Sequence, residues 1–206
     1  MPKDLRYYSL ILAAICVAVF VIQSFSAGFT DSFVLVSSDI LARPWTLITS
    51  IFLHGSLSHL VFNLFALVLF GMILEKFIGS KKFIAVFFVS GVAASIAALT
   101  YPSSLGASGA IYGILGTLAA IRPKMIVWTY GVPMPMVVAA LFYLVLDLAG
   151  MFFPSNIANA AHIAGLLVGV AIGLLLREPR KKTEKKTDKI LNEKQLEQWE
   201  DEWMQL

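Results

Sequence analysis

The stretch ASGAIYGILGTLAAI, residues 107–121, is apolar almost throughout and ends directly at the basic residue Arg122. As a helix it rises about 22 Å, which is less than the roughly 30 Å thickness of a bilayer's hydrocarbon core. If Arg122 holds one end at the membrane surface, the other end, with Ser108, stops inside the membrane. Residues 101–106 then enter the membrane as non-helical backbone, which persists there only inside protein or along a water-filled cavity. The sequence therefore predicts a membrane helix that begins at a polar, water-accessible site.

The composition of the whole chain is that of a polytopic helical membrane protein. Of its 206 residues, 58% are hydrophobic and 14% are charged, whereas soluble domains are about 45–50% apolar and about 25% charged. The single cysteine, Cys16, excludes a disulfide framework and a cysteine metal site, and a net charge of +3 is too small to indicate nucleic-acid binding. We predict an all-α fold with six transmembrane helices, at residues 8–26, 57–75, 83–101, 107–121, 135–152 and 157–176.

Basic residues in the short connections predict the orientation. The connections on one side of the membrane have a single basic residue, Arg43. Those on the other side have eleven: Lys3, Arg6, Lys76, Lys81, Lys82, Arg122, Lys124, Arg177, Arg180, Lys181 and Lys182. Because cytoplasmic loops carry the excess of Lys and Arg, we expect a multi-pass protein of the plasma (inner) membrane with both termini cytoplasmic. Residues 1–180 form the predicted membrane domain, and residues 181–206 a charged cytoplasmic tail. The first apolar run is interpreted as a retained span rather than a cleaved signal peptide.

The connection between spans 1 and 2, residues 27–56, is unusually long. Its mixture of aromatic, apolar and charged residues predicts a segment that is partly embedded at the membrane interface, although a plain surface loop is the simpler alternative. We expect His54 to stabilise this segment. Glu75, at the other end of span 2, is expected to cap the helix packing together with Lys76.

Four polar side chains are predicted to lie at one depth in the membrane. Counted upward from the basic residue at the cytoplasmic end of each span, Ser108, His162, Asn63 and His59 lie about 21, 22, 20 and 25 Å high. Ionisable groups at membrane depth are costly and usually functional. Taken singly, each has an ordinary structural explanation; together, beside a predicted water cavity, they indicate a catalytic site.

The pattern predicts nucleophilic catalysis. A serine hydroxyl becomes a strong nucleophile when an adjacent base takes its proton, and His162 can be that base. The Ser108 N–H at a helix start, the Asn63 amide and the His59 imidazole are the candidate donors to an oxyanion. Supporting roles are expected for residues that permit close approach or pack on the base, namely Gly106, Gly109 and Tyr112.

Glycines predict how the serine and the histidine meet. Gly165, Gly169 and Gly173 recur every four residues below His162, and Gly109, Gly113 and Gly116 form a similar surface below Ser108. Small residues at this spacing let membrane helices pack closely. We expect no well-placed carboxylate, because Asp147 lies toward the outer end of span 5 and is expected to bond loop backbone; the prediction is a Ser–His dyad.

This combination of motifs resembles the rhomboid family of intramembrane serine proteases, in its basic six-span prokaryotic form. The resemblance covers residues 43–173 and rests on three stretches: HGSLSHLVFN (54–63), GASG (106–109) with Tyr112, and AHIAG (161–165). It implies that Ser108 is the nucleophile, that His162 is the base, and that His59 and Asn63 contribute to the oxyanion hole. One departure is Trp45-Thr46, with Arg43 upstream, where many bacterial members have Trp-Arg.

The resemblance also implies the partners. Rhomboids cleave membrane-spanning helices of other proteins near their outer ends, within the lipid bilayer, and use no metal and no organic cofactor. Two alternatives remain: a non-proteolytic relative that binds membrane clients, which usually lacks the serine or the histidine, and a transporter or proton channel. The channel is disfavoured because the helices below Ser108 and His162 are almost wholly apolar.

Overall fold

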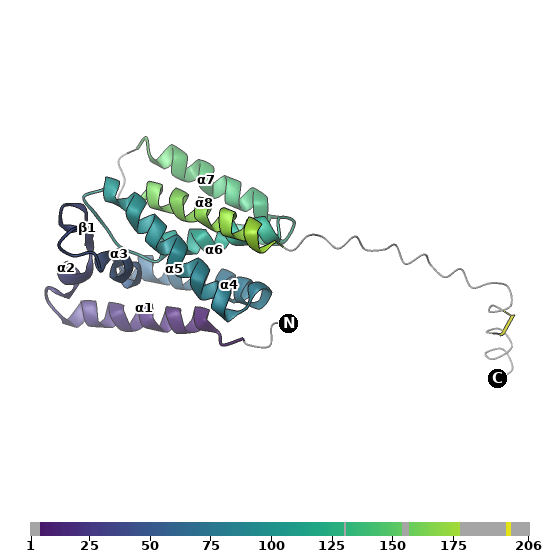
Figure 1. Ribbon diagram of the computed structural model, residues 1–206, viewed down its shortest axis with the longest axis horizontal. Helices are drawn as coiled ribbons and strands as arrows, with labels where there is room; N and C mark the ends of the chain where they lie inside the picture. The colour runs from purple at the N-terminus through teal and green to yellow at the C-terminus, as the bar shows by residue number, and fades with distance from the viewer. Residues whose placement is uncertain (1–4, 130, 154–156, 178–196, 199–206) are drawn as a thin grey trace.

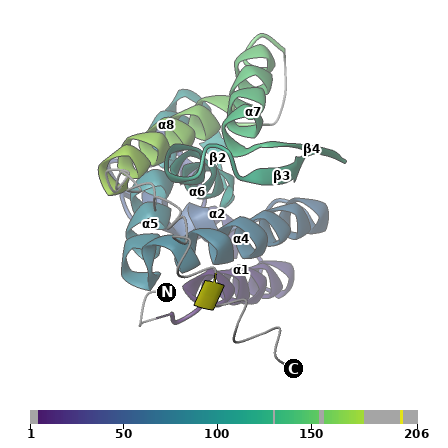
Figure 2. The same cartoon turned by 90° about the vertical axis from the view of Figure 1, so that its right-hand side faces the viewer.

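Helix α6 (Ser108–Ile121) lies at the centre of a helical bundle in the computed structural model, which describes residues 5–129, 131–153, 157–177 and 197–198. It packs against four of the other long helices, and Figure 2 shows them arranged around it. Every residue from Gly113 to Ala120 is buried. A helix that is apolar on all sides is suited to such a central position, which also explains why it does not need the length of a lipid-facing span.

A helix occupies each of the six predicted spans (Figure 1). Beside α6 these are α1 (Tyr8–Phe25), α4 (Leu57–Ile78), α5 (Ser80–Ala97), α7 (Met136–Gly150) and α8 (Asn159–Leu176). Four of them, α1, α4, α5 with the following turn η3 (Ala98–Thr100), and α8, are long and apolar enough to cross a membrane, while α6 and α7 are shorter apolar helices. The helical fold of a membrane protein is therefore confirmed, and the number of six spans stays a prediction.

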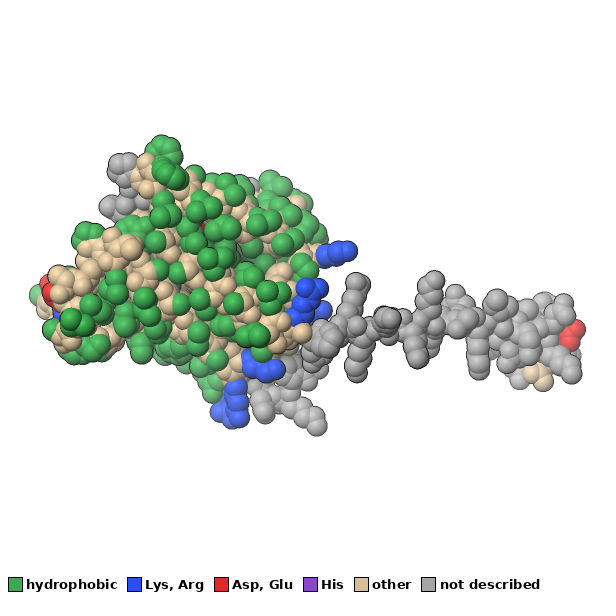
Figure 3. Space-filling model, turned by 45° about the horizontal axis from the view of Figure 1, so that its top comes forward, with side chains coloured by type: hydrophobic (Ala, Val, Ile, Leu, Met, Phe, Trp, Pro, Cys, Tyr) green, Lys and Arg blue, Asp and Glu red, His purple; other side chains and the backbone are tan. Residues whose placement is uncertain are grey.

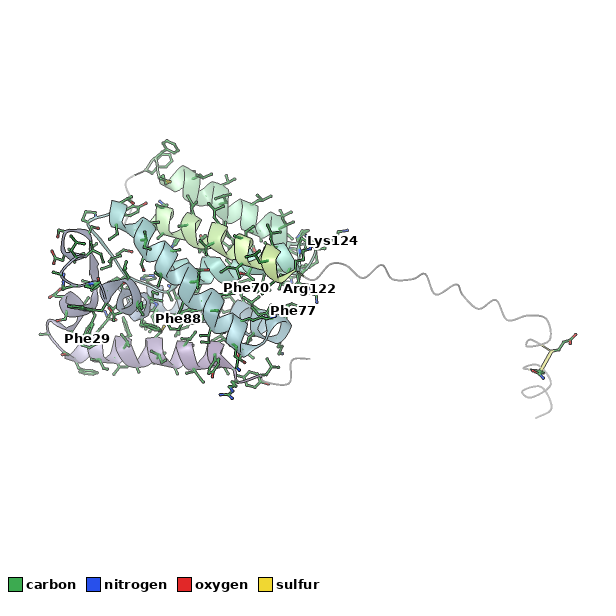
Figure 4. All side chains as sticks on the ribbon, viewed as in Figure 1. Phe29, Phe70, Phe77, Phe88, Arg122 and Lys124 are labelled. Carbon is green, nitrogen blue, oxygen red and sulfur yellow. The ribbon has the colours of Figure 1, made fainter. Side chains whose placement is uncertain are left out.

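Most of the described basic side chains lie together at one end of the bundle. In the space-filling view, apolar side chains cover the middle of the bundle and Lys and Arg side chains gather at one end (Figure 3). Arg122 and Lys124 lie at this end, and Phe29 lies at the opposite one (Figure 4). The Arg122 guanidinium stacks over the Phe77 ring, 4.5 Å from its centroid. Which side of the membrane this end faces stays a prediction.

Helices α6 and α8 approach each other through glycines, as predicted. A Cβ atom at Gly165 or Gly169 would overlap the carbonyl oxygen of Gly109 or Gly113, and one at Gly116 would overlap the carbonyl oxygen of Leu166. Backbone contact at this range allows Thr117 Oγ1 to bond the Gly169 carbonyl at 2.9 Å. The small residues thus bring the starts of the two helices, with Ser108 and His162, side by side.

The segment between α1 and α4 is structured and holds the backbone that leads to Ser108. It contains α2 (Phe29–Phe33), β1 (Leu35–Val36), η1 (Ser37–Asp39), α3 (Thr46–Thr49) and η2 (Ser50–Phe52). Strand β1 pairs antiparallel with β2 (Ser103–Ser104), and the Gly106 N–H donates to the Ser50 carbonyl at 2.9 Å. The predicted non-helical approach to α6 is therefore pinned at two points. Whether this segment is embedded in the membrane stays a prediction.

One connection differs from the sequence-based expectation. The connection between α6 and α7 forms a hairpin of β3 (Ile126–Thr129) and β4 (Val132–Pro135), although two prolines in β4 argue against a strand. An edge strand tolerates them because proline lacks only the N–H.

The charged tail predicted at residues 181–206 falls, apart from residues 197–198, outside the described residues.

Glu75 has a different partner from the one predicted. Its carboxylate does not pair with Lys76 but accepts four hydrogen bonds at 2.6–3.1 Å. Three come from the start of α1, from the Tyr8 and Ser9 N–H groups and the Ser9 hydroxyl, and one comes from the Ser80 hydroxyl at the start of α5. The first N–H groups of a helix lack intrahelical acceptors. The buried carboxylate therefore ties α1 to the α4–α5 corner.

Glu75→Gln is expected to destabilise the fold by about 1–3 kcal/mol, because an amide can accept at only one of its two ends and leaves a buried backbone N–H without a partner. Thermal unfolding in detergent would measure the change. Lys76→Gln is the matched control, since Lys76 is exposed, and it should leave the melting temperature unchanged. An equal loss in both variants would contradict the assigned role of Glu75.

Candidate active site

All four polar residues predicted to share one depth line a single cavity. Its volume is about 870 Å³, and its wall includes Ser108, His162, His59 and Asn63. The remaining wall comes from the loops before α4 and α6, the C-terminal turns of α5 with η3, the start of α8, and η2. A polar-lined space of this size can hold water and a stretch of extended polypeptide.

The serine and the histidine are in direct contact. Ser108 Oγ and His162 Nε2 lie 2.8 Å apart, which is a hydrogen-bond distance for a nucleophile and its base. Ser108 begins α6, and His162 lies in the first turn of α8. The glycine-mediated contact of these two helices therefore produces the pairing.

Tyr112 packs on the base as predicted. Its ring stacks on the His162 imidazole with centroids 4.3 Å apart and an angle of 13° between the planes. Tyr112 lies one helical turn after Ser108, so both project from the same face of α6. The stacking restricts the plane of the imidazole while leaving its nitrogens accessible at the edge.

Two of the predicted oxyanion donors, His59 and Asn63, lie on α4 and line the same cavity as Ser108. Asn63 is buried, and its Nδ2 donates one hydrogen bond to the His59 carbonyl at 2.8 Å. An amide nitrogen has two N–H groups, so one remains for another acceptor. The role of both residues toward an oxyanion stays a prediction.

Both supporting glycines are required by close approach. Gly106 has φ +123°, and a Cβ there would lie 2.7–2.8 Å from ring atoms of His59. A side chain at Gly109 would overlap Ala94 of α5. Gly106 therefore lets the loop turn past the His59 ring, and Gly109 lets the first turn of α6 sit against α5.

The expectation for Asp147 was wrong. Its Oδ1 lies 2.9 Å from His162 Nδ1, rather than on loop backbone, and its side chain is 6% exposed. A carboxylate is thus well placed at the base, which the sequence analysis did not predict. The prediction used only the position of Asp147 along its helix, near the C-terminal end of α7. Nothing in the spacing of the sequence shows that α7 and α8 bring this side chain to the His162 ring.

His54 stabilises the outer segment, as expected. Its backbone N–H and carbonyl bond the Gln23 side chain of α1 at 3.0 and 3.4 Å, and its Nδ1 lies 3.2 Å from the Phe52 carbonyl. Burial, followed by the neighbouring His59, lowers the pKa of His54 to about 4. The ring is therefore neutral at physiological pH and packs edge-on against His59.

Arg43 holds the loop in which the departure from the family pattern was noted. Its guanidinium bonds the Asp39 carboxylate and the Asp31 carbonyl, each at 2.6 Å. Hydrogen bonds from Ser38 and Arg43 lower the pKa of Asp39. Arg43, which lies upstream of Trp45, therefore joins three parts of the segment between α1 and α4 to one another.

Comparison with known proteins gives one consistent relationship. The chain is 32% identical over 186 residues to the rhomboid protease GluP of Bacillus subtilis, covering 84% of this chain and 35% of GluP. It is 28% identical over 180 residues to the rhomboid protease GlpG of Haemophilus influenzae, covering 84% of this chain and 92% of GlpG. It is also 32% identical to the mitochondrial Rhomboid protein 1 of Saccharomyces cerevisiae, again over 84% of this chain and 53% of that protein.

The chain therefore spans about a third of GluP and about half of the yeast protein. The relationship to rhomboid proteins and the apolar helices described above together indicate an integral membrane protein. A family model described as the rhomboid domain matches residues 41–179, the segment from the outer loop to the end of α8. This match covers well over half of the sequence, and the chain belongs to the rhomboid family.

Proposed function

We propose that this protein is an intramembrane serine endopeptidase that cleaves transmembrane helices of other membrane proteins near their outer ends. The observation that carries the proposal is the 2.8 Å contact of Ser108 Oγ with His162 Nε2 inside a polar-lined cavity. The family supports it, because GluP and GlpG are named proteases. A client-binding role without chemistry would not need this contact.

The proposed reaction follows from the two atoms in contact. Ser108 Oγ attacks the scissile carbonyl carbon while its proton passes to His162 Nε2, and the carbonyl oxygen becomes an oxyanion. The C–N bond then breaks, and His162 returns the proton to the leaving amine, which gives an acyl-enzyme. Water, with His162 again as base, hydrolyses the ester and releases the acid. No metal or organic cofactor enters these steps, as the family resemblance implies.

The oxyanion is proposed to be held by the Ser108 N–H at the start of α6, the Asn63 amide and the His59 imidazole. Donors preorganised in a water-poor site are worth more than donors in bulk water. Gly106 lets the loop lie close to the His59 ring, because a side chain at this position would collide with that ring. The donors come from two helices, α4 and α6, so their spacing depends on the packing of these helices.

The substrate is proposed to be a single- or multi-span membrane protein, in a bilayer that both proteins share. A helix cannot expose a peptide bond to a nucleophile while its backbone is fully hydrogen-bonded, so the substrate must unwind locally. The loop of β2, pinned by β1, lies beside the cavity. We further propose six spans with both termini cytoplasmic, which places the cavity toward the outer side of the plasma membrane.

The test is cleavage of a single-span reporter in liposomes by purified protein, with fragments sized by mass spectrometry. Cleavage near the outer boundary of the reporter, together with a fluorophosphonate adduct mapped to Ser108, is the expected result. Retention of the intact reporter without cleavage or adduct would favour the client-binding alternative. Proton flux in the same liposomes would favour the channel alternative.

Asn63→Ala is expected to lower kcat by about 10²–10³-fold with little change in KM, since removal of one oxyanion donor has an effect of this size. Asn63→Asp is the matched variant, because it keeps the shape of the side chain and removes both N–H groups. Steady-state kinetics on the reporter would measure both. If Asn63→Asp retained wild-type kcat, Asn63 would be a packing residue and not a donor.

A further inference from the structure

Asp147 is distinguished from the other buried carboxylate of the bundle by how few partners it has. Glu75 accepts four hydrogen bonds. Asp147 is also buried. Among the described residues, its side chain makes one hydrogen bond, to His162 Nδ1, and its Oδ2 has no partner. Buried polar groups are normally satisfied, so Asp147 is poorly explained as a structural residue. Its one contact is with the base.

The contact determines which nitrogen of His162 faces the serine. An ionised carboxylate can only accept hydrogen bonds, so Nδ1 must carry the proton that it shares with Asp147. In a neutral imidazole, Nε2 is then the nitrogen with the free lone pair. This is the nitrogen that lies 2.8 Å from Ser108 Oγ.

Stacking on Tyr112 cannot provide this orientation. It restricts the plane of the ring, but a 180° flip of the ring about its Cβ–Cγ bond, or a change of tautomer, would keep the stacking and remove the acceptor from Ser108. A hydrogen bond at Nδ1 excludes both. The two contacts therefore do different things to the same ring.

We propose that Asp147 is a positioning residue that holds His162 in the Nδ1–H tautomer, with Nε2 as acceptor toward Ser108, so that a carboxylate orients the base of the Ser108–His162 pair. The inference rests on the proposed function. During attack, the proton of Ser108 moves to Nε2, and the imidazolium that forms keeps its Nδ1–H bonded to the Asp147 carboxylate. The carboxylate thus stabilises the charge that develops on the base.

The test measures the tautomer directly. The chain has three histidines, so ¹⁵N-histidine labelling gives three pairs of ring-nitrogen signals, and the pair missing from His162→Ala identifies His162. We expect the Nδ1–H tautomer in the wild type and a shift toward Nε2–H in Asp147→Asn, whose amide can donate to Nδ1. Asp147→Asn should lower kcat by at least about 10²-fold, as for other losses of general-base function, with KM changed by less than about twofold. Fluorophosphonate labelling of Ser108 should slow in parallel.

Glu75→Gln provides the matched control, since it makes the same carboxylate-to-amide change at the other end of the bundle. It should lower the melting temperature and leave the His162 tautomer and the kcat of folded protein unchanged. An Nε2–H tautomer in the wild type, or wild-type kcat and tautomer in Asp147→Asn, would overturn the proposal. Loss of cleavage in Ser108→Ala alongside normal cleavage in Asp147→Asn would leave the protease function standing. If Asp147→Asn did not fold, or no reporter were cleaved, the wild-type tautomer would still decide.

Discussion

Ser108→Ala is expected to reduce cleavage of the reporter by at least about 10⁴-fold, because removing a covalent nucleophile leaves only substrate binding and oxyanion stabilisation. The fold should survive. Ser108 occupies the first position of α6, where its side chain faces the cavity and contacts His162, and alanine is a good helix former. The measurement is kcat/KM on the single-span reporter, with the melting temperature recorded in the same detergent.

The contact between Ser108 and His162 also predicts how the effects of substituting both residues combine. When nucleophile and base act as a unit, their effects on kcat are strongly non-additive. The double variant Ser108→Ala/His162→Ala should therefore be no slower than Ser108→Ala by itself. If the loss of kcat in the double variant equalled the product of the two single losses, His162 would contribute by some route other than activation of Ser108.

Ser90→Ala is the control for the serine substitution. Ser90 is fully buried on α5 behind α6, its hydroxyl has no recorded partner in the described part of the chain, and it does not line the cavity. It should cleave the reporter at the wild-type rate. Equal cleavage by Ser108→Ala and Ser90→Ala would refute the nucleophile assignment.

Much of the site was predictable because its residues lie on helices that run in the same direction. For Ser108, His162, Asn63 and His59, height above a basic end is proportional to residue number, so a common depth could be counted from the sequence. Depth alone does not show which helices are neighbours, but the glycine repeats predicted that α6 and α8 pack side by side. Backbone contact of Gly165 and Gly169 with α6 confirms that inference.

Asp147 and Glu75 show where such counting fails. Depth along one helix does not show which neighbour a side chain faces, and no glycine pattern marks the contact between α7 and α8. Asp147 was consequently assigned to loop backbone, although it bonds His162. Glu75 was assigned to its sequence neighbour Lys76, although its donors are residues 66 and 67 positions away on α1, and Ser80. Long-range partners of single carboxylates need the packed structure.

The α6–α8 contact that brings the site together also makes the protein sensitive to added bulk. Gly169→Val is expected to destabilise the fold by at least about 2 kcal/mol, as for strongly overpacked positions, and to abolish cleavage. Even the first carbon of the new side chain would overlap the Gly113 carbonyl oxygen, whereas ordinary contact begins near 3.4 Å. Because the obstacle is backbone, it cannot rotate away, and the two helices must separate.

That separation would reach the reacting atoms. Ser108 and His162 are each within two helical turns of the Gly113–Gly169 contact, so moving α8 from α6 stretches the 2.8 Å bond between Oγ and Nε2. Misplacement of catalytic groups by about 1 Å can lower rates about 10²-fold. Ala171→Val is the matched control, because Ala171 lies on the same helix but is exposed. Melting temperature and cleavage should fall together in Gly169→Val and remain unchanged in Ala171→Val; a stable, active Gly169→Val would show that close packing of α6 and α8 is not what assembles the site.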